Sequence, residues 1–475
     1  MVDGPHSPPR PTGLSLVATL RLGLFQACLG CLAVIFSGLL NRVMLTELGL
    51  PGLLVGSALA FEQIVAPSRV LFGQISDSYP LARRHRVPYV LVGTALFCGL
   101  AVLSVPLIFA VGRLQQQGDQ PALAFGVAGL FGLFALYGLA ISLATTPYLA
   151  LVIDRTTETE RPRAVGVIWC MLTVGIVVGA ILISVSLRSL DQIRDPQLLE
   201  ATLRAFMARV ALVVMALTVV ATLGMEPASE PSDLLAARPR EDGVTLAQAW
   251  ALIRSSRQVL IFFSFLILFT LALFLQDPVL ESYGAQVFGM PIAATAQLNA
   301  FWGVGTLVGL LLAGVWIVPA LGKLPTARLG CQLIVLSLLL LLLSGLTASV
   351  AALKVVMVLF GLAAGIGTNS ALCLMLDLTL PQVAGTFVGV WGLAQALSRA
   401  LGKVIGGGLY DLGHLLSKGH AIPALSGSYP TYALVLGVEL LVAIGALLML
   451  KRVNVHQFRE DTGRSLARVL TAEWQ

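Results

Sequence analysis

Residues 138–154 read GLAISLATTPYLALVID, and residues 361–377 read GLAAGIGTNSALCLMLD. They begin an internal repeat in which residues 138–180 align with residues 361–403 without a gap. An aspartate ends both stretches, and a Val-Gly-Val run follows at the same place in each copy. Each copy contains an apolar segment, a polar loop and a second apolar segment in the same order, which is a parallel repeat of the kind found in transporters. The repeat predicts a membrane protein built from two similar halves.

The composition also indicates a membrane protein. Of the 475 residues, 57% are hydrophobic and 11% are charged, and the mean hydropathy is +0.90. A soluble globular protein carries about 25% charged residues, so the composition excludes a cytosolic enzyme, a disordered protein and a nucleic-acid-binding domain. One crossing of a bilayer takes roughly 20 apolar residues, and the length allows about a dozen crossings. We expect an all-α membrane protein.

Twelve apolar segments are expected to cross the bilayer, and one long polar connection at 226–257 divides them into six and six. The two six-helix bundles are predicted at 15–225 and 258–450. A short N-terminal segment, 1–14, precedes them. A tail, 451–475, is predicted to form an amphipathic helix on the inner membrane surface, and a disordered end is the alternative. The expected spans are 15–40, 53–75, 87–111, 122–150, 164–187, 205–225, 258–277, 292–318, 327–346, 350–376, 384–409 and 430–450.

Basic residues set the expected orientation. The chain has 30 Lys and Arg residues against 24 Asp and Glu residues. With both termini in the cytoplasm, most of the basic residues fall in cytoplasmic loops, as the positive-inside rule requires. The surplus charge therefore needs no nucleic acid, and membrane lipid is the expected partner. In this arrangement Arg42 falls in an outer loop, and the outer segment 188–206 is expected to lie on the membrane surface.

No group of residues predicts catalysis. The sequence contains no Walker loop, metal-ligand cluster or nucleophile–base signature. Cys28 and Cys31 have a redox-type spacing, but they lie inside the first apolar segment, where small polarizable residues are expected to serve packing. The chain is therefore not expected to be an enzyme.

The loop between the second and third spans runs from Gly73 through Asp77 to Arg83, Arg84 and Arg86. This order resembles the signature of the major facilitator superfamily, in which Gly-x-x-x-Asp precedes basic residues. Gly73 permits close approach of a helix, and Asp77 is suited to hold a neighbouring helix N-terminus. We expect a structural gate here. The alternative is an ordinary positively charged cytoplasmic loop.

A narrower resemblance is sharpest in the first three spans. It is carried by Leu20–Gln26, Leu40–Met44, Ala66–Arg69, Arg86–Tyr89 and the Asp154-Arg155 pair. In these stretches the chain resembles the PucC/LhaA family, also called the bacteriochlorophyll-delivery family. The sequence around Phe72-Gly73-Gln74 is most similar to the cyanobacterial branch of that family. The resemblance extends over most of the chain.

The resemblance implies a function that composition and spacing do not show. It implies a major facilitator fold of twelve helices in two pseudo-symmetric halves, which binds or delivers chlorophyll or bacteriochlorophyll. It also implies assistance in the assembly of light-harvesting or photosystem complexes. The implied partners are the subunits of those complexes and pigment-synthesis enzymes. The implied location is the inner membrane or a photosynthetic membrane, thylakoid or intracytoplasmic.

A pigment site would need a ligand for the central magnesium. All five His residues fall outside the expected spans, so any side-chain ligand would be a weaker one, or a backbone carbonyl or water would take its place. Tryptophans such as Trp302 and Trp391 could flank a flat ring, although interfacial tryptophans are common in membrane proteins. The candidate ligands in or beside the spans are Asn41, Glu62, Gln63, Asn299 and Gln395.

Charged residues inside the spans are the strongest internal sign of function, because each is costly unless it is paired or lines a cavity. Glu62 and Arg399 are expected at similar depth, and we predict that they pair and close the outer side. Lys403 is expected to pair with Asp277 or Glu281. The alternatives are that Arg399 pairs within its own half, or that these charges only hold helices together. The predicted charge network comprises Glu62, Arg69, Asp77, Arg83, Arg84, Arg86, Asp154, Asp277, Glu281, Asp377, Arg399 and Lys403.

Two classes of function remain open. The first is a membrane protein that binds pigment and assists complex assembly. The second is a secondary transporter of the major facilitator type that moves a small solute, with proton coupling through Glu62 or Asp277. A folate or pterin carrier is a further alternative within the same superfamily.

Overall fold

The structure is a computed structural model of the chain, and it describes residues 14–157, 160–188, 195–227, 257–377, 384–418 and 428–454. Every named element in these ranges is a helix. Most of the N-terminal segment, of the connection at 226–257 and of the tail lies outside the described residues.

The helices of the first half follow the predicted spans closely. The first helix begins as α1 (Leu16–Val34) and continues through π-helical turns, Ile35–Leu40 and Val43–Glu47. The others are α2 (Gly52–Ile64), α3 (Ser68–Ser78), α4 (Val87–Gln117), α5 (Gln120–Arg155), α6 (Arg161–Ser186) and α7 (Pro196–Thr222).

The second half repeats this series. Its helices are α10 (Arg257–Phe274), α11 (Leu280–Phe288), α12 (Ile292–Leu312), α14 (Lys323–Thr347), α15 (Val350–Asp377), α16 (Ala384–Lys418) and α17 (Tyr429–Leu450). A π-helical turn, Ala313–Ile317, joins α12 to the short α13 (Val318–Leu321).

Helices begin and end at residues whose chemistry suits a helix terminus. Ser15, Asp119 and Asp195 each accept a hydrogen bond from a backbone N–H in the first turn of α1, α5 and α7. Such caps satisfy donors that have no partner within the helix. Gly118 ends α4 with a φ of 75°, the left-handed conformation that glycine adopts readily at helix ends.

Each predicted span coincides with a helix. Nine helices in the described residues are long and apolar enough to cross a membrane, and two shorter apolar helices, Gly52–Ile64 and Leu260–Phe274, occupy the second and seventh predicted positions. The 35-residue α16 occupies the eleventh. The prediction of an all-α membrane protein is therefore confirmed.

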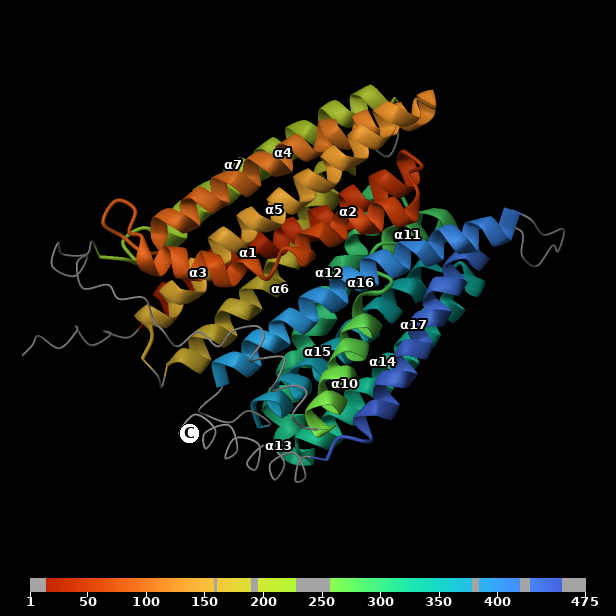
Figure 1. Cartoon of the computed structure of the whole chain (residues 1–475). Helices are drawn as coiled ribbons and strands as arrows, with labels where there is room; N and C mark the ends of the chain where they lie inside the picture. Colours follow the sequence, from red (N-terminus) through yellow and green to blue (C-terminus); the bar gives the residue numbers. More distant parts are fainter. Residues whose placement is uncertain are drawn as a thin grey trace, which may run out of the picture.

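The two halves use equivalent helix contacts. In the first half α4 packs on α5 and α7, and in the second half α14 packs on α15 and α17. The contact of α1 with α6 has its counterpart in the contact of α10 with α16. Two equivalent pairs, α2 with α16 and α6 with α12, join the halves, which Figure 1 shows as an upper and a lower bundle.

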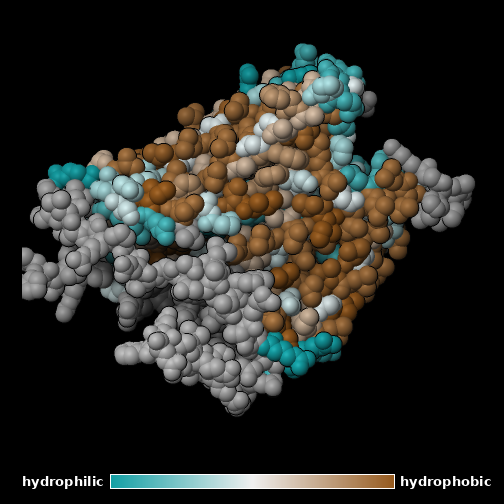
Figure 2. Space-filling view, in the orientation of Figure 1, coloured by the Kyte–Doolittle hydropathy of each residue, from teal (hydrophilic) through white to brown (hydrophobic). Residues whose placement is uncertain are grey.

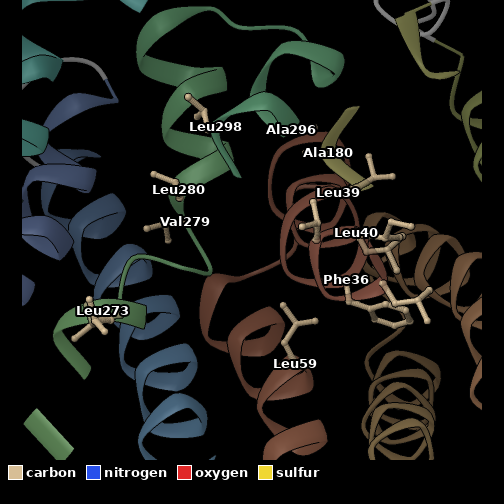
Figure 3. Close-up of a cluster of buried hydrophobic side chains, with 14 of the residues drawn as sticks. Phe36, Leu39, Leu40, Leu59, Ala180, Leu273, Val279, Leu280, Ala296 and Leu298 are labelled. Carbon is tan, nitrogen blue, oxygen red and sulfur yellow. The ribbon is translucent and has the colours of Figure 1, made fainter. Parts of the chain in front are cut away.

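Apolar side chains cover the flank of the molecule. Figure 2 shows them over most of the visible surface, with hydrophilic residues gathered toward the ends of the helices. Inside, the buried core crosses the boundary between the halves. Phe36 and Leu39 of the first helix lie in one cluster with Leu280 of α11 and Leu298 of α12 (Figure 3). The halves therefore share one apolar core.

The structure differs from the prediction at two span boundaries and at one break within a span. The first helix continues to Glu47, so Arg42 is buried inside the bundle rather than placed in an outer loop. The second span is broken between α2 and α3, because Pro67 has no N–H to continue the helix. Since α7 begins at Pro196, the described end of the segment expected on the surface belongs to the sixth helix.

The halves approach at backbone distance where α2 meets α16. A Cβ atom at Gly407 would lie 2.0 Å from the carbonyl oxygen of Gly52, and one at Gly56 would lie 2.1 Å from that of Lys403. Both obstacles are backbone atoms, so a side chain fits only if the helices move apart. Glycine is therefore required at this contact.

Gly407→Ala should destabilise the protein by about 1–3 kcal/mol, because α2 and α16 must shift to admit the methyl group. Gly408→Ala is the matched control, since a Cβ there meets only Leu53 Cδ1 at 3.6 Å. Thermal unfolding of both variants in mild detergent measures the difference. Equal melting temperatures would contradict the described contact.

Candidate functional site

The contact between the halves is strongest at one end of the molecule. We call it the Asp411 end, and we call the opposite end, where α4 begins, the Arg86 end. Asp411 of α16 accepts hydrogen bonds from the backbone N–H groups of Gly52 at 2.6 Å and Leu53 at 2.8 Å. These groups begin α2, so a side chain of the second half caps a helix of the first.

A broken helix lies beside this contact. A turn that contains Pro278 separates α10 from α11 and leaves backbone groups without helical partners. Asn41, fully buried on the first helix, donates from Nδ2 to the carbonyl oxygen of Pro278 at 2.6 Å. Glu439 of α17, also fully buried, accepts a bond from the backbone N–H of Gln276 at 3.3 Å. The break is therefore held from both halves.

A second group of polar side chains links the first helix to α11 and α12. Arg42 donates to the hydroxyl of Thr295, and Asn299 donates from Nδ2 to Glu281 Oε1 at 2.7 Å. Arg42 and Glu281 also attract each other electrostatically. Gly38 makes room for this carboxylate, because a Cβ there would lie 2.1 Å from Glu281 Oε1.

A third group surrounds Asp277, in the turn after α10. Its carboxylate interacts with the hydroxyl of Ser37 and, electrostatically, with Lys403 and Arg399 of α16. The ammonium of Lys403 lies 3.4 Å from Ser37 Oγ. The three groups together form what we call the interface network: Ser37, Asn41, Arg42, Asp277, Pro278, Glu281, Thr295, Asn299 and Lys403.

The predicted ion pair between Glu62 and Arg399 is not formed. Within the described residues Arg399 makes neither an ion pair nor a hydrogen bond, and its guanidinium lies over the Phe274 ring, 4.4 Å from the centroid. Glu62 accepts a hydrogen bond from its neighbour Gln63 at 3.2 Å. The pair was predicted from the similar depth of the two residues in the membrane. The face of α2 that meets α16 carries Gly52 and Gly56 instead of Glu62.

Lys403 was expected to form an ion pair with Asp277 or Glu281, and the structure shows a weaker interaction. Lys403 interacts electrostatically with Asp277, but no ion pair between them occurs in the described residues. Ser37 interacts with both charges: its Oγ lies 3.4 Å from the Lys403 ammonium, and its hydroxyl acts on the Asp277 carboxylate. A residue of the first half therefore bridges two residues of the second.

The Arg86 end contains a cluster of charged groups within the first half. Arg86 forms ion pairs with Asp77 and with Asp154, the latter at 3.1 Å. Glu226 accepts bonds from the backbone N–H groups of Arg86 at 2.9 Å and Val87 at 2.7 Å, and so caps α4. Partial burial alone would lower the pKa of the Arg86 guanidinium, but Asp154 and Asp77 together raise it above its ordinary value.

The turn before Arg86 contains two further predicted residues. Arg83 and Arg84 belong to a tight turn closed by the Leu81–Arg84 bridge. Ala82 and Arg83 both have positive φ angles, 51° and 60°, as the central residues of a type I′ turn require. The turn directs the chain so that Arg86 meets the ends of α3 and α5.

Three more residues considered in the sequence analysis lie on α15 and α16. Gln395, on α16, is half-buried and makes no hydrogen bond among the described residues. Asp377 ends α15, and its side chain lies outside the described part of the structure. His414, expected outside the spans, lies on α16 because that helix is longer than predicted, and its ring is parallel to that of Tyr410.

Comparison with known proteins identifies the family. A model of the family described as "PUCC protein" matches residues 39–458. The chain belongs to the PUCC family. It is 31% identical over 417 residues to a protein of Rhodobacter capsulatus described as "Uncharacterized protein in puhA-bchM intergenic region", covering 86% of this chain and 83% of that one. It is 28% identical over 439 residues to Protein PucC of the same organism, covering 91% and 92%.

A further relative bears an enzyme's name. The chain is 30% identical over 455 residues to a Rhodobacter capsulatus protein called "Bacteriochlorophyll synthase 44.5 kDa chain", covering 92% of this chain and 95% of that one. The family thus includes proteins named for the bacteriochlorophyll pathway. The assignment to a cyanobacterial branch stays a prediction.

Solved structures confirm the major facilitator fold. A bacterial homologue of the lysosomal transporter Spinster superposes with a TM-score of 0.62 at 16% identity, covering 93% of this chain and 97% of that one. A D-xylose–proton symporter superposes with a TM-score of 0.63 at 16% identity, covering 93% and 98%. At this identity the likeness shows the fold alone.

Several residues of this PUCC family chain were not predicted from sequence. Ser37 and Thr295 carry no charge and so give no signal in an apolar span. Asp411 and Glu226 lie just outside the predicted spans. An acid directly beyond a span end is the signal that could have identified both as caps.

Arg42→Met should destabilise this PUCC family protein by about 3–5 kcal/mol. The change removes the bonds of Arg42 to Thr295 and Met290, its ion pair with Glu47 and its attraction for the buried Glu281. Adding Glu281→Gln should recover part of that loss. Arg113→Met is the control, since its pair with Glu200 lies on the surface, with Arg113 56% exposed, and is worth less than about 1 kcal/mol. Thermal unfolding in detergent measures all three. A double variant no more stable than Arg42→Met would refute the pairing.

Asp411→Ala should cost about 0.5–2 kcal/mol, since it removes the cap of α2. Asp411→Asn should cost less, because its amide oxygen still accepts one of the two bonds. The same unfolding assay ranks the three proteins. An unchanged melting temperature for Asp411→Ala would show that the cap contributes nothing.

Proposed function

We propose that the chain binds or delivers chlorophyll or bacteriochlorophyll and assists the assembly of light-harvesting or photosystem complexes. The observation that carries the proposal is the PUCC family match over residues 39–458. Relatives named PucC and a bacteriochlorophyll synthase chain match over nearly their full length. Subunits of those complexes and pigment-synthesis enzymes are the proposed partners.

The proposed location is the inner or photosynthetic membrane, with both termini on the cytoplasmic side. Charge at the Arg86 end supports this orientation. Arg83, Arg84, Arg86 and Arg155 all lie there, at the ends of α4 and α5, and basic residues collect on the cytoplasmic side of membrane proteins.

The candidate pigment ligands differ in the hydrogen bonds that their side chains already make. Asn41 and Asn299 use their amide N–H groups within the interface network. Glu62 and Gln63 bond to each other and are half-buried. Gln395 makes no hydrogen bond among the described residues. We therefore favour Gln395, whose amide makes no bond among the described residues, as the side chain that approaches a bound pigment.

The proposed role is to bind and present a pigment, with no covalent step. The name "Bacteriochlorophyll synthase 44.5 kDa chain" belongs to a relative and does not assign a synthase activity to this chain. The residues brought together in this chain hold helices and charges in place: hydroxyls, amides and paired ions at the boundary between the halves.

A second candidate function is secondary transport of a small solute. The fold is shared with a D-xylose–proton symporter. The interface network also places two acids, Asp277 and Glu281, between halves that alternate in transporters. Proton coupling through Asp277 or Glu62 would belong to this function.

Deleting the gene in a phototrophic host should lower the amount of assembled chlorophyll–protein complexes, measured by membrane absorbance, while general solute uptake stays normal. Reintroducing the intact chain should restore the complexes, and a chain carrying the stable Gly408→Ala change should do the same. Normal complexes together with loss of uptake of one solute would instead support transport.

A further inference from the structure

Two arginines from opposite halves, Arg69 and Arg399, form no ion pair in the described part of the chain; Arg69 is exposed and Arg399 is half-buried. Arg69 lies on α3 and Arg399 on α16, and each lies within the electrostatic range of the other. Neither forms an ion pair or a hydrogen bond with any described residue. An unpaired arginine within a membrane is costly, so such residues usually mark a site that is completed by something else.

The register of α2 against α16 places the two arginines. The helices run antiparallel, with Gly56 against Lys403. One turn further from the Asp411 end, Arg399 reaches the level of Ala60, close to Glu62. Arg69 lies about two turns beyond Glu62 along α2 and α3. The two arginines come from opposite halves, and each is near enough to Glu62 to interact with it electrostatically.

The charges around this region do not balance. Asp277 interacts electrostatically with both Lys403 and Arg399. Glu62 is the carboxylate that acts on both Arg69 and Arg399, and its Oε1 already accepts a bond from Gln63. The three cations Lys403, Arg69 and Arg399 thus share two acids, Asp277 and Glu62, which leaves one positive charge in excess among these five groups.

The surroundings of Arg399 suit a flat apolar molecule. Its guanidinium lies over the ring of Phe274, and that ring meets Trp302 edge-on, with centroids 6.5 Å apart. The indole Nε1 of Trp302 and Arg399 Nε are both buried, and neither has a hydrogen-bond partner among the residues that the structure describes. Gln395, also without a bond, lies one turn from Arg399 on the same helix. Aromatic surface and unused donors therefore occur together.

We propose that Arg69 and Arg399 bind a carboxylate borne on a flat apolar ring: a magnesium tetrapyrrole with a free propionate, rather than its long-chain ester. The proposal rests on the proposed pigment function and names the form of the pigment. A guanidinium binds a carboxylate through two parallel hydrogen bonds, which an ester cannot accept in the same way. The ring would lie toward Phe274 and Trp302.

The test compares chlorophyllide a with its methyl ester, which differ by one methyl group and one charge. Each is titrated into the purified chain in mild detergent, and affinity is read from the shift of pigment absorbance. The intact chain should prefer chlorophyllide by about tenfold or more, since a hydrogen bond to a charged group contributes roughly 1.5–3 kcal/mol. Arg399→Gln and Arg69→Gln should each reduce this preference toward one, with affinity for the ester little changed.

The control is Arg209→Gln, on the exposed face of α7, where Arg209 bonds to the carbonyl of Ala205 in its own helix. It should keep the full preference. Because the readout is a ratio of two affinities within one protein, partial loss of folded protein does not change it.

The outcomes separate this inference from the function on which it rests. Equal affinity for both pigments in the intact chain would overturn the inference and leave pigment binding standing. Binding of neither pigment would overturn both. If phosphatidylglycerol displaces chlorophyllide and its retention by the protein depends on Arg399, the arginines form a lipid-phosphate site and the inference fails.

Discussion

Inside a membrane a polar group must find its partner within the protein, because lipid supplies none, and the contact between the two halves depends on this constraint. The turn at Pro278 leaves a carbonyl without its helical donor, and Asn41 of the other half supplies one. Asp411 does the same for the first N–H groups of α2. Each half is therefore completed by the other. The bonds to Asp411 lie where the glycines of α2 and α16 bring backbones together.

Sequence reasoning predicted the fold well because it rests on signals that are strong in single spans. Twelve apolar runs, a polar connection and the repeat that aligns residues 138–180 with residues 361–403 are all visible without a structure. The residues of the cluster at Asp77, Arg86 and Asp154 were also predicted from the sequence. The motif between the second and third spans contains Asp77 and Arg86, and the loop after the fourth span includes Asp154. The break in the second span at Pro67 was not predicted, because the hydropathy of a segment does not show where its helix is interrupted.

The site was predicted less well, for a physical reason. Depth along a helix can be counted, but the rotation of the helix decides which face meets a neighbour. Glu62 and Arg399 lie at similar levels, yet the face that α2 turns toward α16 carries Gly52 and Gly56. Arg42 was assigned to a loop because it is charged, whereas acceptors such as Thr295 on another helix stabilise it in the interior. Partners of this kind become visible only with tertiary structure.

The hydrogen bonds that cross between the halves are unevenly placed, and this has a mechanical consequence. In the described residues they join positions 37–53 and Ser184 to positions 277–297 and 403–411, all toward the Asp411 end. That end can serve as a pivot and the rest of α16 as a lever. From Asp411 back to the start of α16 is roughly 40 Å at 1.5 Å per residue. Each degree of rocking about the pivot therefore moves the far end by roughly 0.7 Å, so a small rotation separates the halves there by the thickness of a flat ring.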